Sequence, residues 1–282
     1  MKKIFVISAL ITLIIFGTNH AVSQVRIEDN YRFAIKEMSF VPFYDYFPIG
    51  TLKGCDYSGA FNELIDFITN KSKAKISPYC TTSYKKAVEM GAKKDADIIL
   101  GMYSDNSLYD EWKIVYPAII DNPVHLVMTP SRINQVKSVD DLTKLKGAIS
   151  SHDHFNEYVN VQLKNFDITT FDNNDELFRK LITGEIDYIF ITYWYGMAES
   201  IKLGITDMVS FSKRGVWTMP LFIGVSKMSS SRTALLHYLT EWISQDELRQ
   251  KIKDAAFEAL KQLAEDNSGT VPEDYNINKS NM

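Results

Sequence analysis

Aromatic and hydroxyl side chains lie where predicted β-strands end, and these residue types are suited to holding a small solute. In open α/β sheets, ligands collect at the carboxyl edges of the strands. An aromatic ring there stacks on a planar ligand or faces a cation, with about 0.5–2 kcal/mol per cation contact. The candidate ligand-binding residues of this kind, including the possible counter-charges Asp45 and Asp105, are Phe43, Tyr44, Asp45, Tyr79, Tyr103, Ser104, Asp105, Thr192, Tyr193, Trp194 and Trp217. Aromatic residues make up 12% of the chain, so core packing is the alternative role for each ring.

The segment from Ser150 to His154 lies between a predicted strand and a predicted helix. The backbone N–H groups and hydroxyls of Ser150 and Ser151 could hold an anionic group at the helix N-terminus, so both are candidate ligand-binding residues. The alternative is that Ser151 or Asp153 is a plain helix cap. The pair His152 and His154 is a weak metal signal without further ligands, and we predict no metal and no other cofactor.

The sequence carries no recognisable catalytic motif. It lacks a Gly-x-Ser-x-Gly elbow, a His-Glu-x-x-His helix and a Gly-rich phosphate loop. Glu185, His152 and His154 could act as acids or bases, but nothing in their spacing brings them together. We therefore predict a protein that is not an enzyme.

Short apolar runs alternate with amphipathic runs along most of the chain, which is typical of an α/β fold. The expected strands are residues 31–40, 75–79, 96–101, 123–128, 147–150, 186–191, 208–211 and 221–225. The expected helices are residues 57–69, 83–90, 156–164, 175–183, 195–203 and one or two within 232–264. We expect an aromatic loop at residues 43–47 and an irregular stretch before residue 123.

Residues 1–23 have the order of a secretory signal peptide. A basic start at Lys2 and Lys3 precedes an almost wholly apolar run of 13 residues, and small residues follow at Ala21 and Ser23. An uncleaved anchor is the alternative, but the run is shorter than the roughly 20 residues that a bilayer span needs. We predict cleavage after Ser23 and export to the periplasm.

Composition excludes several classes of protein. Of 282 residues, 45% are hydrophobic and 23% are charged, which excludes collagen-like, disordered and polytopic membrane chains. The net charge of −4, without a basic stripe, gives no support for nucleic-acid binding.

The two cysteines are expected to form one disulfide. Cys55 is placed at the opening of the first helix and Cys80 at the end of the second strand, which lie close together in a doubly wound sheet. Export favours oxidation, and a bridge closing about 25 residues adds about 3 kcal/mol in the chain-entropy model. Two separate buried thiols are the alternative.

Five segments, in this order, resemble the type II periplasmic solute-binding proteins of the amino-acid type. GCDYSGAF at 54–61 is similar to the family's entry into its first helix, and KKDADIILGM at 93–102 to its third strand. SVDDL at 138–142 with LKG at 145–147 resembles a turn of the family. The last two segments are DELFRKLITGEIDYIFI at 175–191 and FIGVSK at 222–227, which resemble a helix with its strand and the return strand.

The resemblance implies a two-lobed periplasmic-binding-protein-like fold, each lobe a doubly wound sheet, with two crossover strands between the lobes. Lobe one would comprise residues 25–122 and 217–264, and lobe two residues 123–216. Residues 265–282 are expected to be a disordered tail. The motion that the family implies is a hinge closure that hides the ligand.

The sequence departs from the family at the site that holds α-amino acids. Such members place an arginine shortly after the third strand to grip the carboxylate, and an aspartate at the end of a lobe-two strand to face the ammonium. Here residues 103–109 contain no arginine, and the matching strand ends at Ile191, Thr192 and Tyr193. A ligand held by the usual clamp is therefore not expected.

Together these features predict an exported, monomeric substrate-binding protein that captures a small polar or amino-acid-like solute for the permease of an ABC transporter. Tyr103, Tyr193 and Trp194 are expected to contribute most to affinity. One alternative is an accessory or sensor binding protein of a periplasmic redox system. Another is a lyase of the same fold acting on a small cyclic acid.

Overall fold

The computed structural model describes residues 30–36, 45–48, 55–81, 84–103, 110–153 and 155–267, with the backbone alone for 30–36, 45–48, 55–58, 75–81 and 84–85. Its strands are β1 (Asn30–Lys36), β2 (Asp45–Pro48), β3 (Cys55–Ser58), β4 (Lys75–Thr81), β5 (Ile98–Met102), β6 (Trp112–Met128), β7 (Lys146–Ser150), β8 (Asp167–Phe171), β9 (Tyr188–Thr192), β10 (Ser210–Phe211) and β11 (Trp217–Ser226). Its helices are α1 (Phe61–Ser72), α2 (Tyr84–Ala92), α3 (Pro130–Ile133), the 3-10 helix η2 (Val139–Lys144), α4 (Glu157–Leu163), α5 (Asn174–Thr183), α6 (Tyr193–Lys202), α7 (Arg232–Ile243) and α8 (Asp246–Asp266).

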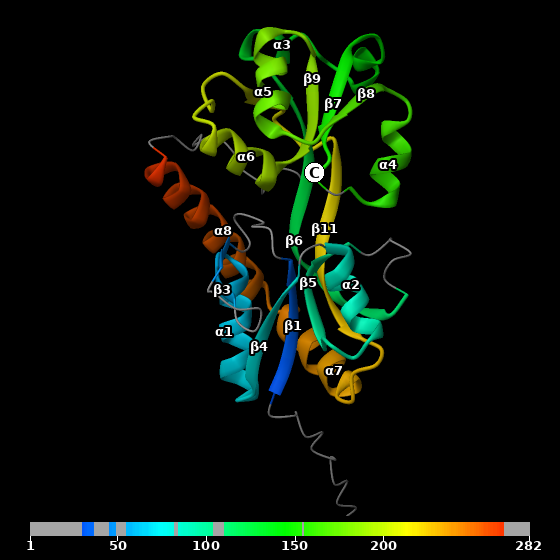
Figure 1. Cartoon of the computed structure of the whole chain (residues 1–282), viewed down its shortest axis with the longest axis vertical. Helices are drawn as coiled ribbons and strands as arrows, with labels where there is room; N and C mark the ends of the chain where they lie inside the picture. Colours follow the sequence, from blue (N-terminus) through cyan, green and yellow to red (C-terminus); the bar gives the residue numbers. More distant parts are fainter. Residues whose placement is uncertain are drawn as a thin grey trace, which may run out of the picture.

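One nine-stranded sheet runs through the molecule in the order β4-β1-β5-β11-β6-β9-β7-β8, with β10 added to β6 (Figure 1). Parallel strands form each end, β4-β1-β5 and β9-β7-β8. The long antiparallel pair β6 and β11, here termed the crossover strands, joins the two halves. With 17 residues, β6 extends for about 55 Å, enough to enter both halves.

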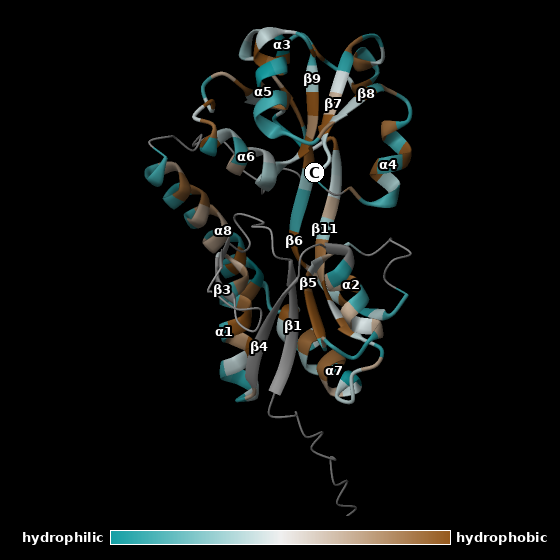
Figure 2. Ribbon diagram, viewed as in Figure 1, coloured by the Kyte–Doolittle hydropathy of each residue, from teal (hydrophilic) through white to brown (hydrophobic). Residues whose placement is uncertain are grey.

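Helices cover both halves of the sheet and bury their apolar faces on it (Figure 2). The larger core cluster extends from α1 and β5 across the crossover strands to β9 and α6. A second cluster lies under α5, where Leu177, Phe178 and Leu181 are each at most 1% exposed. In Figure 2, β6 changes from brown to teal between the two halves, and Asp121 and Asn122 are the polar pair of this stretch.

Helix α5 shows how local sequence sets an element. Asn173 accepts a hydrogen bond from the backbone N–H of Glu176 and so caps the first turn. Gly184 ends the helix with φ of 76°, a left-handed conformation that glycine adopts without steric cost. The prediction of a helix at 175–183 ended by Gly184 is confirmed, as are the strands predicted at 75–79, 147–150, 186–191 and 221–225.

The first part of β6 and the whole of β8 were not predicted as strands. The stretch before residue 123 is not irregular, because β6 already begins at Trp112 and pairs with β11 along both halves. Pro117 and the polar pair Asp121–Asn122 interrupt the apolar pattern, so the pairing with a distant strand determines the structure here. Strand β8 lies at the sheet edge with exposed polar side chains, which gives no apolar run to detect.

The region around the first helix also differs from the prediction. Residues 45–48 of the expected aromatic loop form β2, which pairs antiparallel with β3. Helix α1 begins at Phe61, not at residue 57, because the chain turns at Gly59 with φ of 109°. Cys55 therefore lies on β3 and not at the opening of the helix.

The predicted signal peptide lies outside the described residues, as does the predicted tail from residue 268 onward. Helix α8 continues to Asp266, two residues past the expected end of lobe one at residue 264. The cleavage site stays a prediction.

Candidate functional site

Polar contacts from both halves of the sheet converge on the middle of the crossover strands. Asn122 of β6 lies opposite Met219 of β11, and both side chains are fully buried. The carboxyl ends of β5, β7 and β9 reach the same level, where ligands collect in such sheets. Four predicted site residues lie at these ends: Tyr103 follows β5, Ser150 ends β7, Thr192 ends β9, and Tyr193 begins α6.

Tyr103 is linked to the crossover strand through Asn122. The Asn122 Nδ2 donates to the Tyr103 hydroxyl over 3.3 Å, and both side chains are buried. Within the described part of the chain, Oδ1 of Asn122 has no hydrogen-bond donor. A buried acceptor without a donor lowers stability by about 1–3 kcal/mol. Assigning the amide oxygen and nitrogen the other way round would leave N–H groups of Asn122 without an acceptor instead. Asn122 therefore keeps an unused acceptor among the described residues, although its side chain is fully enclosed in this structure.

Asp153 links the end of β7 to the start of α6. Its carboxylate accepts the backbone N–H of Thr192 at 2.5 Å and the Thr192 hydroxyl at 2.8 Å. Asp153 is 7% exposed and Thr192 is fully buried. The hydroxyl of Thr192 is thus committed to holding this junction, although Thr192 was predicted as a ligand contact.

The segment after β7 is shaped by contacts within its own half of the sheet. The Ser150 hydroxyl donates to Oδ1 of Asn174 at 2.8 Å, and the backbone N–H of half-buried Ser151 donates to the carbonyl of Phe171. The cap of α4 is Asn156, whose side chain accepts from Val159, so neither Ser151 nor Asp153 caps this helix. The N–H of Asn156 donates to Met219 Sδ at 3.2 Å, which brings the helix start against the crossover strand.

Tyr193 and Trp194 are fully buried. The Tyr193 ring packs against His125 at 5.4 Å and against Phe211 at 5.8 Å, measured between centroids. Trp194 packs against Phe257 of α8 at 4.9 Å, and its Nε1 donates to the carbonyl of Asp121 at 2.9 Å. In this structure both rings pack in the core, which was the alternative role for such aromatics.

Of the remaining predicted site residues, the structure describes the side-chain contacts of Trp217 alone. Trp217 is half-buried and packs on Phe190 at 4.7 Å. Outside the described residues lie Phe43, Tyr44, Ser104 and Asp105, and only the backbone is described for Asp45, Tyr79, Cys55 and Cys80. The ligand role of these residues and the disulfide therefore stay predictions.

Sequence reasoning missed Asn122 as a site residue and assigned Asp153 only a helix cap. The available signal for Asn122 was a polar pair within the apolar stretch 118–128. The partner of Asp153 depends on β7 and β9 lying side by side, about 40 residues apart in sequence.

His125 is a buried titratable group that packs against Tyr193 at the start of α6. Burial lowers its pKa to about 4, although the hydrogen bond to the carbonyl of Ser212 opposes the shift. The ring is therefore neutral at pH 7 and acts as a packing group beside Tyr193. In the described ranges no three His, Cys, Asp or Glu side chains gather to hold a metal ion. The site presents hydrogen-bonding groups suited to binding a solute.

No family model matches the chain, and no curated protein matches its sequence. Solved structures do match. An amino acid ABC transporter substrate-binding protein from Streptococcus pneumoniae bound to L-arginine is 13% identical, with TM-score 0.62 over 84% of this chain and 96% of that one. A protein from Wolinella succinogenes, named as a binding component of an ABC transporter and complexed with lysine, is 18% identical, with TM-score 0.63 over 84% and 95%. The periplasmic VFT2 domain of BvgS from Bordetella pertussis is 11% identical, with TM-score 0.61 over 80% and 93%.

The chain has the fold of the type II periplasmic binding proteins. The resemblance noted in the sequence and the predicted two-lobed α/β fold are confirmed. In this fold the two halves of the sheet are the lobes (Figure 1), and Asn122 lies on β6 just before the part that pairs with β9 of lobe two. No helix among the described residues is long and apolar enough to cross a membrane.

Proposed function

We propose that this chain is an exported binding protein that captures a small polar or amino-acid-like solute between its lobes and presents it to the permease of an ABC transporter. The observation that carries this proposal is the likeness, over 84% of the chain, to substrate-binding proteins holding arginine and lysine. The signal peptide predicted at residues 1–23 would place the chain in the periplasm. It would act there as a monomer, without catalysis, with one disulfide between Cys55 and Cys80.

The solute would be recognised without the family's usual clamp. Residues 103–109 supply no arginine, and β9 leads through Thr192 directly into the buried Tyr193. In this proposal the amide of Asn122 and the hydroxyl of Tyr103, both buried in the arrangement seen here, would meet the ligand where the lobes part. A ligand N–H or O–H directed at Asn122 Oδ1 would satisfy that oxygen, so the proposal favours solutes that carry such a donor.

A sensor or accessory role is the second candidate. The observation that favours it is the likeness in fold to the periplasmic VFT2 domain of BvgS, which is not named as a transporter component. In that role the chain would use the same interlobe site, but its macromolecular partner would not be a permease.

The test is titration calorimetry of the mature protein with arginine, lysine, glutamine, glutamate, putrescine, glycine betaine and phenylacetate. We expect at least one solute to bind. Asn122→Leu should weaken that binding by about 1–3 kcal/mol, because the buried oxygen that meets the ligand is lost. The unfolding free energy of the unliganded variant should stay within about 1 kcal/mol of wild type, because removing the unsatisfied oxygen offsets the loss of the Nδ2 hydrogen bond to Tyr103.

Lys227→Met is the matched control, since Lys227 lies beyond the end of β11 and away from Asn122. It should bind the same solute with wild-type affinity. If the Asn122→Leu variant also binds normally, the proposed interlobe site is wrong. If no solute binds, and the protein instead copurifies with a periplasmic enzyme, the accessory role replaces transport.

A further inference from the structure

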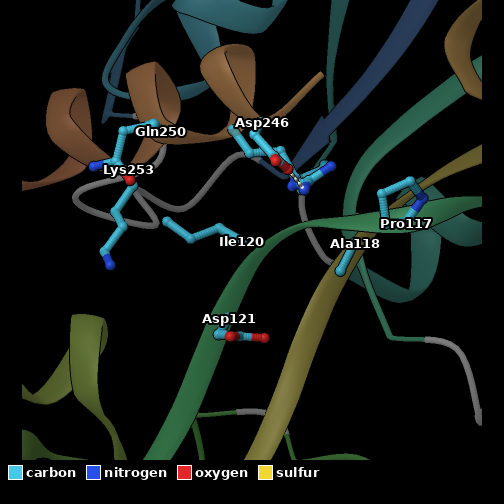
Figure 3. A pocket seen from close by; sticks show the side chains of 9 residues that line it. Pro117, Ala118, Ile120, Asp121, Asp246, Gln250 and Lys253 are labelled. Atoms are coloured by element: carbon cyan, nitrogen blue, oxygen red, sulfur yellow. Dashed lines mark hydrogen bonds and ion pairs between the residues drawn. The ribbon is translucent and has the colours of Figure 1, made fainter. Parts of the chain in front are cut away.

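A cavity lies at the outer edge of the crossover strand β6, beneath helix α8 (Figure 3). Its volume is about 410 Å³, within the range of sites for small ligands. One wall is residues 117–121 of β6, and the other is formed by Asp246, Arg249, Gln250 and Lys253 of α8. We term it the hinge cavity.

The hinge cavity is distinct from the interlobe site at Asn122. Asp121 and Asn122 are neighbours on one strand, so their side chains point to opposite faces. Asn122 contacts Tyr103, whereas Asp121 lines the hinge cavity. A ligand in the hinge cavity would therefore meet a different set of side chains from a solute held at Asn122.

Two opposite charges face the cavity from opposite walls. Arg249 is held at the rim, where it pairs with exposed Asp246 and donates to the carbonyl of Ile243. Asp121 on β6 and Lys253 on α8 are each half-buried and line the cavity from its two walls (Figure 3). Burial raises the pKa of Asp121 and lowers the pKa of Lys253, and in both cases their mutual attraction opposes the shift. Burial thus disfavours both charged forms, and a ligand with complementary charges in the cavity would favour them.

We propose that the hinge cavity binds a small zwitterion whose ammonium and carboxylate are separated by a short apolar spacer. The ammonium meets Asp121, the carboxylate meets Lys253, and the spacer lies over Ile120 and Pro117. This inference goes beyond the proposed solute capture and does not depend on it.

A ligand in the hinge cavity would affect how the two lobes are held relative to each other. The carbonyl of Asp121 accepts a hydrogen bond from Trp194 of α6, and Trp194 packs against Phe257 of α8. The strand wall of the cavity is therefore tied to lobe two, and α8 packs both on α1 in lobe one and on α6 in lobe two. An occupant that bridges α8 and β6 would favour the lobe arrangement seen here.

The test uses ω-amino acids of graded length as probes: 4-aminobutyrate, 5-aminopentanoate and 6-aminohexanoate. Calorimetry should show one of them binding wild type, and binding should weaken at least tenfold in Asp121→Asn and in Lys253→Met. Lys251→Met, an exposed lysine on the same helix, should bind normally. 1,5-Diaminopentane and glutarate, which each lack one of the two charges, should bind at least tenfold more weakly than the best zwitterion.

The indole N–H resonance of Trp194 provides a local readout in ¹⁵N NMR, because this group donates to the strand that lines the cavity. It should shift on addition of the probe to wild type and not in Asp121→Asn. The inference is overturned if no ω-amino acid binds, or if binding survives both cavity substitutions. If binding is instead lost in Asn122→Leu alone, the probe occupies the interlobe site, and the hinge cavity proposal fails while the proposed function stands.

Discussion

Replacing Asp153 with asparagine should loosen the junction between β7, β9 and α6. The carboxylate receives two hydrogen bonds, from the N–H and the hydroxyl of Thr192, and uses one oxygen for each. The asparagine amide has only one acceptor oxygen, so its NH₂ group would face one of the two Thr192 donors without forming a hydrogen bond. A hydrogen bond to a charged group contributes about 1.5–3 kcal/mol, and both side chains are buried, so we expect the unfolding free energy to fall by about that amount.

Urea unfolding followed by circular dichroism measures this loss as a lower midpoint. Asp140→Asn is the control with the same chemical change, because Asp140 is exposed on the 3-10 helix, and it should stay within about 0.5 kcal/mol of wild type. Thr192→Val should cost less than Asp153→Asn, since it removes only the hydroxyl bond. An Asp153→Asn midpoint equal to that of wild type would refute the proposed anchoring of α6.

Two further predictions concern His125 and the cysteines. In the native state His125 stays neutral down to about pH 4, whereas the unfolded chain takes up a proton near pH 6.5. Stability should therefore fall by up to about 3 kcal/mol as the pH drops from 6.5 toward 4, and His125→Gln should remove that part of the slope in urea titrations at each pH; an unchanged slope would contradict the assignment. Thiol titration of denatured, unreduced protein should find no free thiol, and two reactive thiols would show that Cys55 and Cys80 are not bridged.

Local signals were sufficient for much of the fold. Asn173 and Gly184 mark both ends of α5, and the apolar run before Thr192 marks β9. The length of β6 could not be read in the same way, because its polar middle is held by pairing with β11, about 100 residues away in sequence.

The candidate site was less predictable than the fold for a related reason. Residue type alone does not separate an aromatic that lines a cleft from one that fills a core, and Tyr193 and Trp194 proved to be fully buried. The link from Asn122 to Tyr103 depends on how β5 and the crossover strands align, which no local pattern encodes. Strand edges could be located from sequence, but the contacts of each side chain at those edges could not.

Native mass spectrometry of the mature protein, purified quickly without added solutes, is the most direct test of solute binding. We expect one small molecule per chain, lost on denaturation and identifiable from its mass, or a one-to-one adduct with a solute that the calorimetric screen selects. The same adduct should be depleted in Asn122→Leu and retained in Lys227→Met. A spectrum that shows only the bare polypeptide, both as purified and after incubation with every solute of the screen, would contradict a solute-binding role.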